Sequence, residues 1–166
     1  LQNSQKIEAY KLIGKFYLGR SKEKANEYYS KAMKISDSPV KDIYEIQRQY
    51  QSKDSMLSFI DLLEVVKRTN PGLSEIYALQ AETISEYKKD LTNAITVYSD
   101  AILLDPYRSD YYTAIGLVYY KKKSYNKALK LFSRATKINP MDATAFYNKA
   151  CMNSILGCLL YTSPSP

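Results

Sequence analysis

The densest pattern of charged residues lies in KKKSYNKALKLFSRATK, residues 121–137, which holds seven basic residues and no acidic one. Four of them are spaced three, four and three residues apart, so a helix would carry on one face the side chains of Lys127, Lys130, Arg134 and Lys137. Such a row of cations could attract RNA, an anionic lipid surface or an acidic protein surface. We favour the alternative, a lysine-rich face in contact with solvent, because the row lacks clustered arginines and interleaved exposed aromatic residues.

The sequence offers little for catalysis. It contains no histidine, which excludes Cys-His and Ser-His nucleophile pairs and any zinc site that uses histidine. The acidic residues are scattered, and the sequence has neither a glycine-rich phosphate loop nor a cluster of metal ligands. We therefore expect no enzyme, no cofactor and no metal site, and we keep open an active site elsewhere in a longer parent protein.

The composition indicates a folded protein of about one domain. The 166 residues are 45% hydrophobic and carry a net charge of +7, which is enough apolar content for a core. The sequence has no uninterrupted apolar run of 18 residues and no basic segment followed by an apolar leader. We expect neither a membrane span nor secretion, and a cytoplasmic or nuclear location.

Both ends of the sequence suggest a fragment. It begins with Leu1 instead of methionine. The last nine residues, CLLYTSPSP from Cys158 to Pro166, depart from the helical pattern and resemble one reading frame of a sequencing-library adapter. We expect this segment to be a non-native tail. One cysteine then remains, Cys151, which we interpret as a small buried hydrophobic residue in a helix.

A repeat with a period of about 34 residues organises the sequence. The segments TNAITVYSDAILLDP and NKALKLFSRATKINP share two alanines, an aromatic residue and a proline at the same offsets, namely Ala94, Tyr98, Ala101 and Pro106 in one and Ala128, Phe132, Ala135 and Pro140 in the other. The pattern Tyr-x-x-Ile-Gly-x-x-Tyr occurs at residues 10–17 and again at 112–119. Apolar residues between the repeat ends fall at helical intervals, which predicts pairs of helices joined by short polar turns.

These residues give the chain a resemblance to the tetratricopeptide-repeat (TPR) family over residues 5–157. The resemblance implies an all-α, right-handed solenoid of antiparallel helix hairpins with about four and a half repeats. The repeats are expected at about 5–39, 40–71, 72–106 and 107–140, with a partial repeat at 141–157. Gly14, Gly116 and the repeated alanines are then packing residues, which form depressions that receive Tyr and Phe from neighbouring helices.

The second repeat departs from this pattern. Phe59 and Val66 occupy the places where alanine is expected. Two interpretations follow: the hairpin opens there, or its register slips by one residue and places Ser58 at the small position.

The first helices of a TPR array line a concave groove, and the resemblance implies which residues would face it here. Repeats one and two would contribute Lys11, Lys15, Lys41, Tyr44 and Arg48. Repeat three would contribute Glu75, Glu82 and Glu86, and repeats four and five would contribute Thr113, Leu117, Tyr120, Tyr147 and Cys151. The carboxylate clamp with which some TPR domains hold chaperone C-termini is not expected, because Lys15 and Glu45 stand where that clamp needs asparagine.

We therefore predict a protein-protein interaction scaffold that binds a protein or an extended, partly acidic peptide in the groove. Two alternatives stay open. One is a nucleic-acid-binding helical repeat that uses the basic outer face, and the other is the non-catalytic regulatory arm of a larger enzyme.

Overall fold

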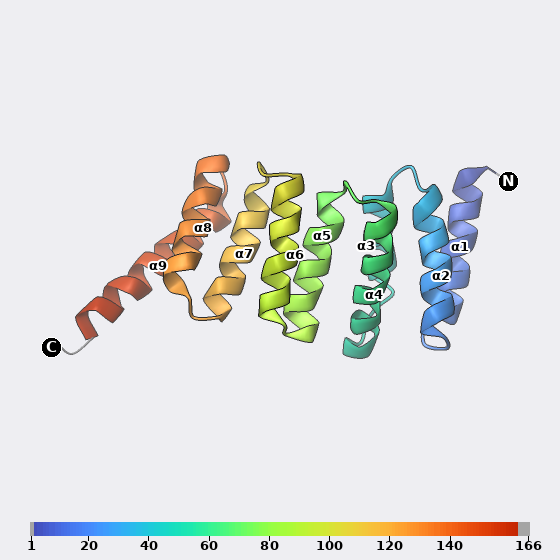
Figure 1. Ribbon diagram of the computed structural model, residues 1–166, viewed down its shortest axis with the longest axis horizontal. Helices are drawn as coiled ribbons and strands as arrows, with labels where there is room; N and C mark the ends of the chain where they lie inside the picture. Colours follow the sequence, from blue (N-terminus) through green and yellow to red (C-terminus); the bar gives the residue numbers. More distant parts are fainter. Residues whose placement is uncertain (1, 163–166) are drawn as a thin grey trace. The chain divides into compact units, whose positions relative to one another are not determined.

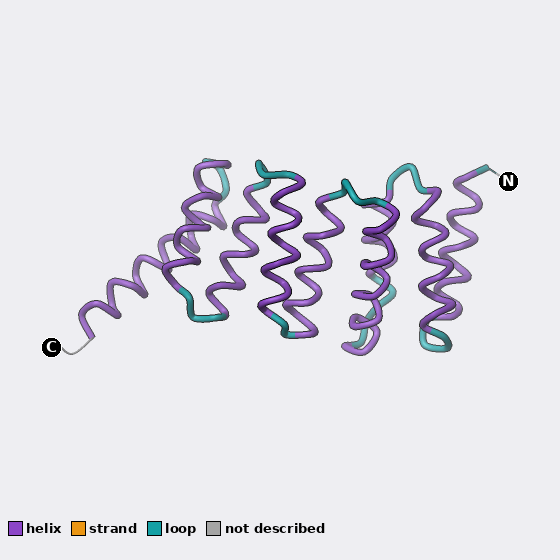
Figure 2. Tube along the Cα trace, viewed as in Figure 1, coloured by secondary structure: helices purple, strands orange, loops and turns teal. Residues whose placement is uncertain are grey.

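The computed structural model describes residues 2–162, and every regular element in that range is a helix, as Figures 1 and 2 show. The predicted all-α class is confirmed. The chain divides into two compact units, an N-terminal unit up to Lys89 and a C-terminal unit from Asp90. This division falls inside the third predicted repeat, and the repeat boundaries themselves stay predictions. The two units are described separately below.

The N-terminal unit contains five α-helices and a final π-helical turn. Its elements are α1 (Asn3–Tyr17), α2 (Lys22–Ile35), α3 (Pro39–Gln47), α4 (Lys53–Thr69), α5 (Ser74–Thr83) and η1 (Ile84–Lys88). Local sequence explains several of the starts. The Ser21 side chain accepts a hydrogen bond from the Lys24 N–H, Ser52 and Ser55 form a capping box at α4, and Pro39 occupies the first turn of α3.

Helices α1 and α2 form a close antiparallel hairpin because Gly14 has no side chain. A Cβ atom at Gly14 would lie 2.7 Å from the ring of Tyr29, closer than such atoms can approach. The C-terminal unit repeats this contact, since a Cβ at Gly116 would lie 2.6 Å from the ring of Phe132. The prediction that these glycines receive aromatic side chains is confirmed. The neighbouring alanines are fully buried as well, namely Ala25, Ala32, Ala128 and Ala135.

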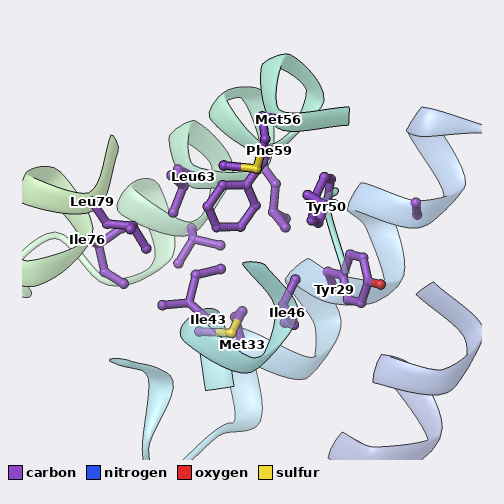
Figure 3. Packing of buried hydrophobic residues seen from close by; sticks show 13 residues of the cluster. Tyr29, Met33, Ile43, Ile46, Tyr50, Met56, Phe59, Leu63, Ile76 and Leu79 are labelled. Carbon is purple, nitrogen blue, oxygen red and sulfur yellow. The ribbon is translucent and has the colours of Figure 1, made fainter. Parts of the chain in front are cut away.

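The second predicted repeat is an opened hairpin. Helix α4 packs against α2 and α5, whereas α3 packs against α2. Tyr50 lies in the connection between α3 and α4, and its ring centroid is 6.1 Å from that of Tyr29 and 4.9 Å from that of Phe59. Phe59 and Val66 are both fully buried. The first of the two interpretations is therefore confirmed: the hairpin opens to admit the large side chains, and Tyr50 fills the space beside Phe59 (Figure 3).

The core of the N-terminal unit gathers around this opening. Figure 3 shows the side chains of α2, α3, α4 and α5 meeting in one cluster, whose largest members include Tyr29, Met33, Ile43, Ile46, Tyr50, Phe59, Leu63 and Ile76. The cluster joins three of the predicted repeats within this unit. A substitution that changes the packing of one of these helices is therefore expected to disturb the packing of the others.

Up to residue 162 the C-terminal unit consists of four helices, α6 (Leu91–Leu104), α7 (Ser109–Lys121), α8 (Tyr125–Ile138) and α9 (Ala143–Thr162). Helix α8 packs against both α7 and α9, and α7 also contacts α6 and α9. The Asp90 side chain accepts a hydrogen bond from the Asn93 N–H and begins α6. A small core of Ala128, Phe132 and Met152 lies among α7, α8 and α9.

Helix α9 corrects one expectation from the sequence. The segment from Cys158 was expected to break the helical pattern, but the helix continues to Thr162. The physical reason is local, because no proline precedes Pro164 in this segment and Leu159 and its neighbours are compatible with a helix. The remainder of the predicted tail, residues 163–166, lies outside the described residues. Across residues 2–162, none of the helices combines the length and apolar character that a membrane crossing requires.

Candidate functional site

Four of the predicted groove residues, Leu117, Tyr120, Tyr147 and Cys151, meet around one pocket in the C-terminal unit. Leu117 and Tyr120 lie three residues apart on α7 and share a face of that helix, and Tyr147 lies on α9. Together with residues of α8 and α9 they line a pocket of about 400 Å³. Its other lining residues are Phe132, Asn148, Met152, Ser154 and Ile155.

The buried part of the pocket is apolar, and its exposed rim is partly aromatic. Phe132 and Met152 are buried, while Leu117 is 38% exposed, Tyr120 43% and Tyr147 72%. None of the residues that line the described pocket carries a formal charge. Large apolar side chains that remain exposed around a concave surface are typical of a binding site for another protein.

Cys151, which the sequence pattern indicates as a small buried residue and the resemblance as groove-facing, lines the pocket and is half-buried. Its hydrogen bond with the Tyr147 phenol, and the charge interaction between the two groups, raise the pKa of Tyr147 above its usual value. The hydroxyl of Tyr147, like that of any neutral tyrosine, can donate a hydrogen bond at the rim.

Thr113 does not join this pocket. Its side chain is 6% exposed, and its Oγ1 atom finds no hydrogen-bond partner within residues 2–162. Thr113 is thus buried, although it lies one turn before the exposed Leu117 on the same helix. A groove-facing role for Thr113 finds no support in this geometry.

The remaining groove candidates belong to the N-terminal unit. Lys15 on α1 and Lys41 and Tyr44 on α3 are exposed, as is Arg48 at the end of α3. Lys15 lines a pocket of about 210 Å³ together with Leu12, Gln49 and the buried Tyr29. Among the predicted acidic residues, Glu82 and Glu86 are exposed and Glu75 is half-buried.

Lys11 is held by three carboxylates. Its ammonium group donates hydrogen bonds to Glu45 at 2.6 Å, to Glu8 at 2.8 Å and to Asp42 at 3.2 Å. Partial burial works to lower the pKa of Lys11, but the bonds to Glu45, Glu8 and Asp42 outweigh it and raise the pKa well above its ordinary value. The hydrogen bond from Lys11 in turn lowers the pKa of Glu45. The Lys11 charge is thus neutralised and has little left to offer an acidic ligand.

The three carboxylates have oxygen atoms within 4.8 Å of one another. Such a group could suggest a metal site, but the Lys11 ammonium already lies among them. We therefore describe Lys11, Glu8, Asp42 and Glu45 as the lysine clamp, which ties α1 to α3. A signal for this clamp exists in the sequence, because Lys11 and Glu45 are 34 residues apart and occupy equivalent positions in adjacent repeats.

The basic stripe lies on the surface of α8. Lys127, Lys130, Arg134 and Lys137 are all exposed, and none of them takes part in an ion pair in the described part of the chain. The Lys127 ammonium lies 5.4 Å from the ring centroid of Tyr119, and the Arg134 guanidinium lies 6.0 Å from that of Tyr112. The basic row of α8 has no interleaved aromatic residues of its own, but Tyr119 and Tyr112 of the neighbouring helix α7 lie next to two of its cations.

Sequence reasoning missed the deeper part of the pocket. Phe132, Met152 and Ile155 line it but were not groove candidates. The sequence pattern identified Phe132 only as a packing residue. The contribution of these three residues depends on how α8 and α9 approach α7, which residue spacing alone does not encode.

Comparison with known proteins agrees with this fold. The profile of the family described as "TPR repeat" matches residues 116–150, a segment that contains Leu117, Tyr120 and Tyr147. Human "Tetratricopeptide repeat protein 6" is 34% identical over 73 residues, which cover 44% of this chain and 14% of that protein. Human "Serine/threonine-protein phosphatase 5" is 36% identical over 69 residues, which cover 42% of this chain and 14% of the phosphatase.

A longer but weaker match is the "BBSome complex member BBS4 homolog" of Drosophila melanogaster, 22% identical over 149 residues, 89% of this chain and 31% of that protein. The chain therefore spans less than a third of the length of each of these relatives.

Among solved structures, the "Crystal structure of MamA protein" has a TM-score of 0.64 at 20% identity, covering 93% of this chain and 84% of that one. YrrB, "a TPR protein with an unusual peptide-binding site", has a TM-score of 0.61 at 18% identity, covering 95% and 84%. At these identities the likeness concerns the fold.

Proposed function

We propose that the chain is a tetratricopeptide-repeat protein that acts as a protein-interaction scaffold, and that its C-terminal unit binds an apolar side chain of a partner in the pocket of Leu117, Tyr120 and Tyr147. The observation that supports this most directly is the pocket itself. It is concave and uncharged, and large apolar side chains remain exposed at its rim.

The chemistry of the pocket indicates what it would accept. An aliphatic or aromatic side chain would pack on Phe132 and Met152 and remove the exposed part of Leu117 from water. The rim hydroxyls of Tyr120 and Tyr147 would pair with the peptide backbone beside that side chain. We infer a short peptide segment with one apolar anchor residue, since such anchors supply most of the affinity in small interfaces.

The charge of the N-terminal unit favours acidic residues in the partner. Lys15, Lys41 and Arg48 are exposed cations, and they attract acidic residues by long-range electrostatics. Lys11 contributes less than the sequence suggested, because the lysine clamp neutralises it.

The proposal is tested by selecting binders from a displayed library of random peptides and measuring their affinity for three forms of the chain. The first is unmodified, the second carries Leu117→Ser, and the third carries Leu103→Ser. Leu103 is a matched control, since it is an exposed leucine of the same unit, 81% exposed, and does not line the pocket. We expect the selected peptides to contain an aliphatic or aromatic residue. Their affinity should fall at least about tenfold with Leu117→Ser and should not change with Leu103→Ser. Equal effects of the two substitutions would remove the pocket from the proposal.

A second candidate function rests on the basic stripe of α8. Four exposed cations without ion pairs in the described residues, two of them next to tyrosine rings, are suited to a polyanion such as RNA. This surface lies on a different helix face from the pocket, so the two functions are separable by mutation.

The match to phosphatase 5 keeps the regulatory-arm alternative open. That relative is an enzyme by name, and the matched residues cover 14% of it. A scaffold attached to a catalytic domain would use the same pocket to recruit or restrain a partner. The pocket proposal is thus independent of what else the parent protein contains.

A further inference from the structure

A second cavity, away from the groove candidates, lies in the N-terminal unit. It has a volume of about 350 Å³ and lies between the turn that joins α1 to α2 and the first two turns of α4. Its lining includes Gly19 and Asn26 on one side, Ser55 and Ser58 on the other, and Tyr50 from the connection between α3 and α4. This volume is within the range of pockets that hold small ligands or single side chains.

The opened second hairpin produces this cavity. Helix α4 packs on α2 instead of closing on α3, and it presents the small side chains of Ser55 and Ser58 towards the start of α2. Gly19, with a φ of +84°, and Ala25 add little volume from the opposite side. The departure from the repeat pattern that the sequence showed at Phe59 therefore creates a space that a regular hairpin would fill.

Two polar atoms of this lining lack partners. Tyr50 is 5% exposed, and its hydroxyl makes no hydrogen bond to any described residue. The Oδ1 atom of Asn26 is likewise buried and unpaired within residues 2–162. Buried polar atoms without partners are costly in a folded protein, and both of these belong to residues that line the same cavity.

The sister repeats show that packing does not require a polar residue at Asn26. Ala25 corresponds to Ala94 and Ala128 in the repeat pattern, so Asn26 corresponds to Ile95 and Leu129. Leu129 packs against the core of its own unit. An apolar residue is therefore compatible with this position of the hairpin, and the asparagine is retained at a cost in stability.

Three charged residues line the cavity, and its two cations are already engaged, whereas the exposed carboxylate of Asp54 adds a negative charge that disfavours an anionic ligand. Lys22 is paired with Asp61, and Arg20 donates a hydrogen bond to the Phe16 carbonyl and lies 4.4 Å from the centre of the Phe16 ring. The deeper part of the cavity, at Ala25, Asn26 and Tyr50, carries no formal charge. This lining favours an uncharged polar group over a carboxylate or an ammonium.

We propose that this cavity binds a neutral amide group, which donates an N–H to the Asn26 side chain and accepts the Tyr50 O–H. An amide carries a donor and an acceptor next to each other, so it pairs with Asn26 whichever way that carboxamide is turned. The group belongs either to a free small amide or to an Asn or Gln side chain of a bound peptide.

The experiment is a nuclear magnetic resonance titration of the full chain, followed at the backbone amides of Asn26 and Ser55. The probes are propionamide, propionate as an isosteric anion, and the peptides acetyl-Ala-Gln-Ala-amide and acetyl-Ala-Leu-Ala-amide. We expect saturable shifts with propionamide and none with propionate. A gain for the glutamine peptide over the leucine peptide assigns the site to peptide side chains, and a response to propionamide alone assigns it to free amides.

Two variants test the residues. Asn26→Leu introduces the residue of the fourth repeat, and Tyr50→Phe keeps the ring that packs on Phe59 while it removes the hydroxyl. Each substitution should lower the affinity for propionamide at least about tenfold, because one buried hydrogen bond to the ligand can no longer form. Tyr112→Phe, which removes a hydroxyl bonded to the Pro106 carbonyl in the other unit, is the control and should change nothing.

Asn26→Leu should also raise the melting temperature, since it replaces an unpaired buried polar atom with an apolar side chain, and this readout separates loss of binding from loss of folding. Three results would each overturn the proposal: equal saturation by propionate, unchanged propionamide binding in both variants, or no saturable shift with any probe. The last result would mean that the cavity holds only ordered water. Because this cavity shares no residue with the pocket of Leu117, Tyr120 and Tyr147, its failure leaves the proposed function untouched.

Discussion

Single glycines set how closely the helices of each hairpin approach. Gly14 faces Tyr29 in the first hairpin, and Gly116 faces Phe132 in the fourth. The aromatic ring lies where a side chain at the glycine would have to be. The two contacts are equivalent in the repeat, so the same constraint acts twice in one chain.

Replacing Gly116 with alanine should therefore destabilise the C-terminal unit. A Cβ there would lie 2.6 Å from the buried Phe132 ring, which has little room to move. We expect Gly116→Ala to lower the free energy of unfolding by about 1–3 kcal/mol, as overpacking does. Gly157→Ala is the control, because it is also helical and a Cβ there meets nothing within 4 Å. That substitution should raise stability slightly through helix propensity. Chemical denaturation of both variants makes the comparison, and equal effects would contradict the packing interpretation.

The lysine clamp should make stability depend on pH. Because the Lys11 hydrogen bond holds the pKa of Glu45 below its unfolded value, the contribution of Glu45 is present above about pH 4.3 and is lost as the pH falls through the folded pKa. The pKa of Lys11 is raised, so its contribution is present at neutral pH and is lost only as the pH rises through the folded value.

The variant Lys11→Met leaves Glu8, Asp42 and Glu45 close together without a cation. It should melt lower than the unmodified chain at pH 7, and the difference should shrink towards pH 3 as the carboxylates become protonated. Lys31→Met is the control, since it removes an exposed pair with Glu27. Thermal melts across this range decide the point. A difference that does not vary with pH would mean that Lys11 acts through packing alone.

At the scale of the elements, α3 and α4 should differ in local stability. Helix α3 has nine residues and is held by two buried isoleucines and the lysine clamp. Helix α4 has 17 residues and buries five large side chains, Met56, Phe59, Leu62, Leu63 and Val66. The two helices of this opened hairpin do not protect each other as α1 and α2 do.

Hydrogen exchange should therefore be faster in α3 than in α4, because local opening of a short helix exposes less apolar surface. Mass spectrometry of peptides from residues 39–47 and 56–66 makes the measurement. The pair α7 and α8 is an internal reference, since a closed hairpin should exchange at similar rates in both helices. Equal protection of α3 and α4 would indicate that the opened hairpin is as cooperative as the closed ones.

At the scale of the whole molecule, the strongest excess of basic over acidic residues lies in one segment near the C-terminus. Residues 111–157 carry eight basic residues and one acidic residue. The four exposed cations of the basic stripe contribute half of these basic residues. A concentration of this kind controls association with polyanions and leaves the fold unaffected.

Retention on an RNA or heparin column should therefore fall steeply with salt and depend on α8. We expect the double variant Lys127→Glu, Lys130→Glu to elute at a clearly lower salt concentration than the unmodified chain. Lys31→Glu, Lys34→Glu is a charge-matched control on α2 of the other unit. If both pairs shift elution equally, net charge governs retention and the stripe is not a binding surface.

The repeat pattern by itself determined the all-α hairpins and their packing residues, because small and aromatic residues must recur wherever helices cross closely. Gly14, Gly116 and the alanines could be identified without coordinates for this reason. The resemblance to the repeat family also predicted that Leu117, Tyr120 and Tyr147 face the same groove. Only the tertiary structure decided that they enclose a pocket over Phe132 and Met152, that Lys11 is neutralised by three carboxylates, and that the second hairpin opens beside Tyr50. These features depend on the approach of side chains from different helices, a distance that periodicity along the chain does not specify.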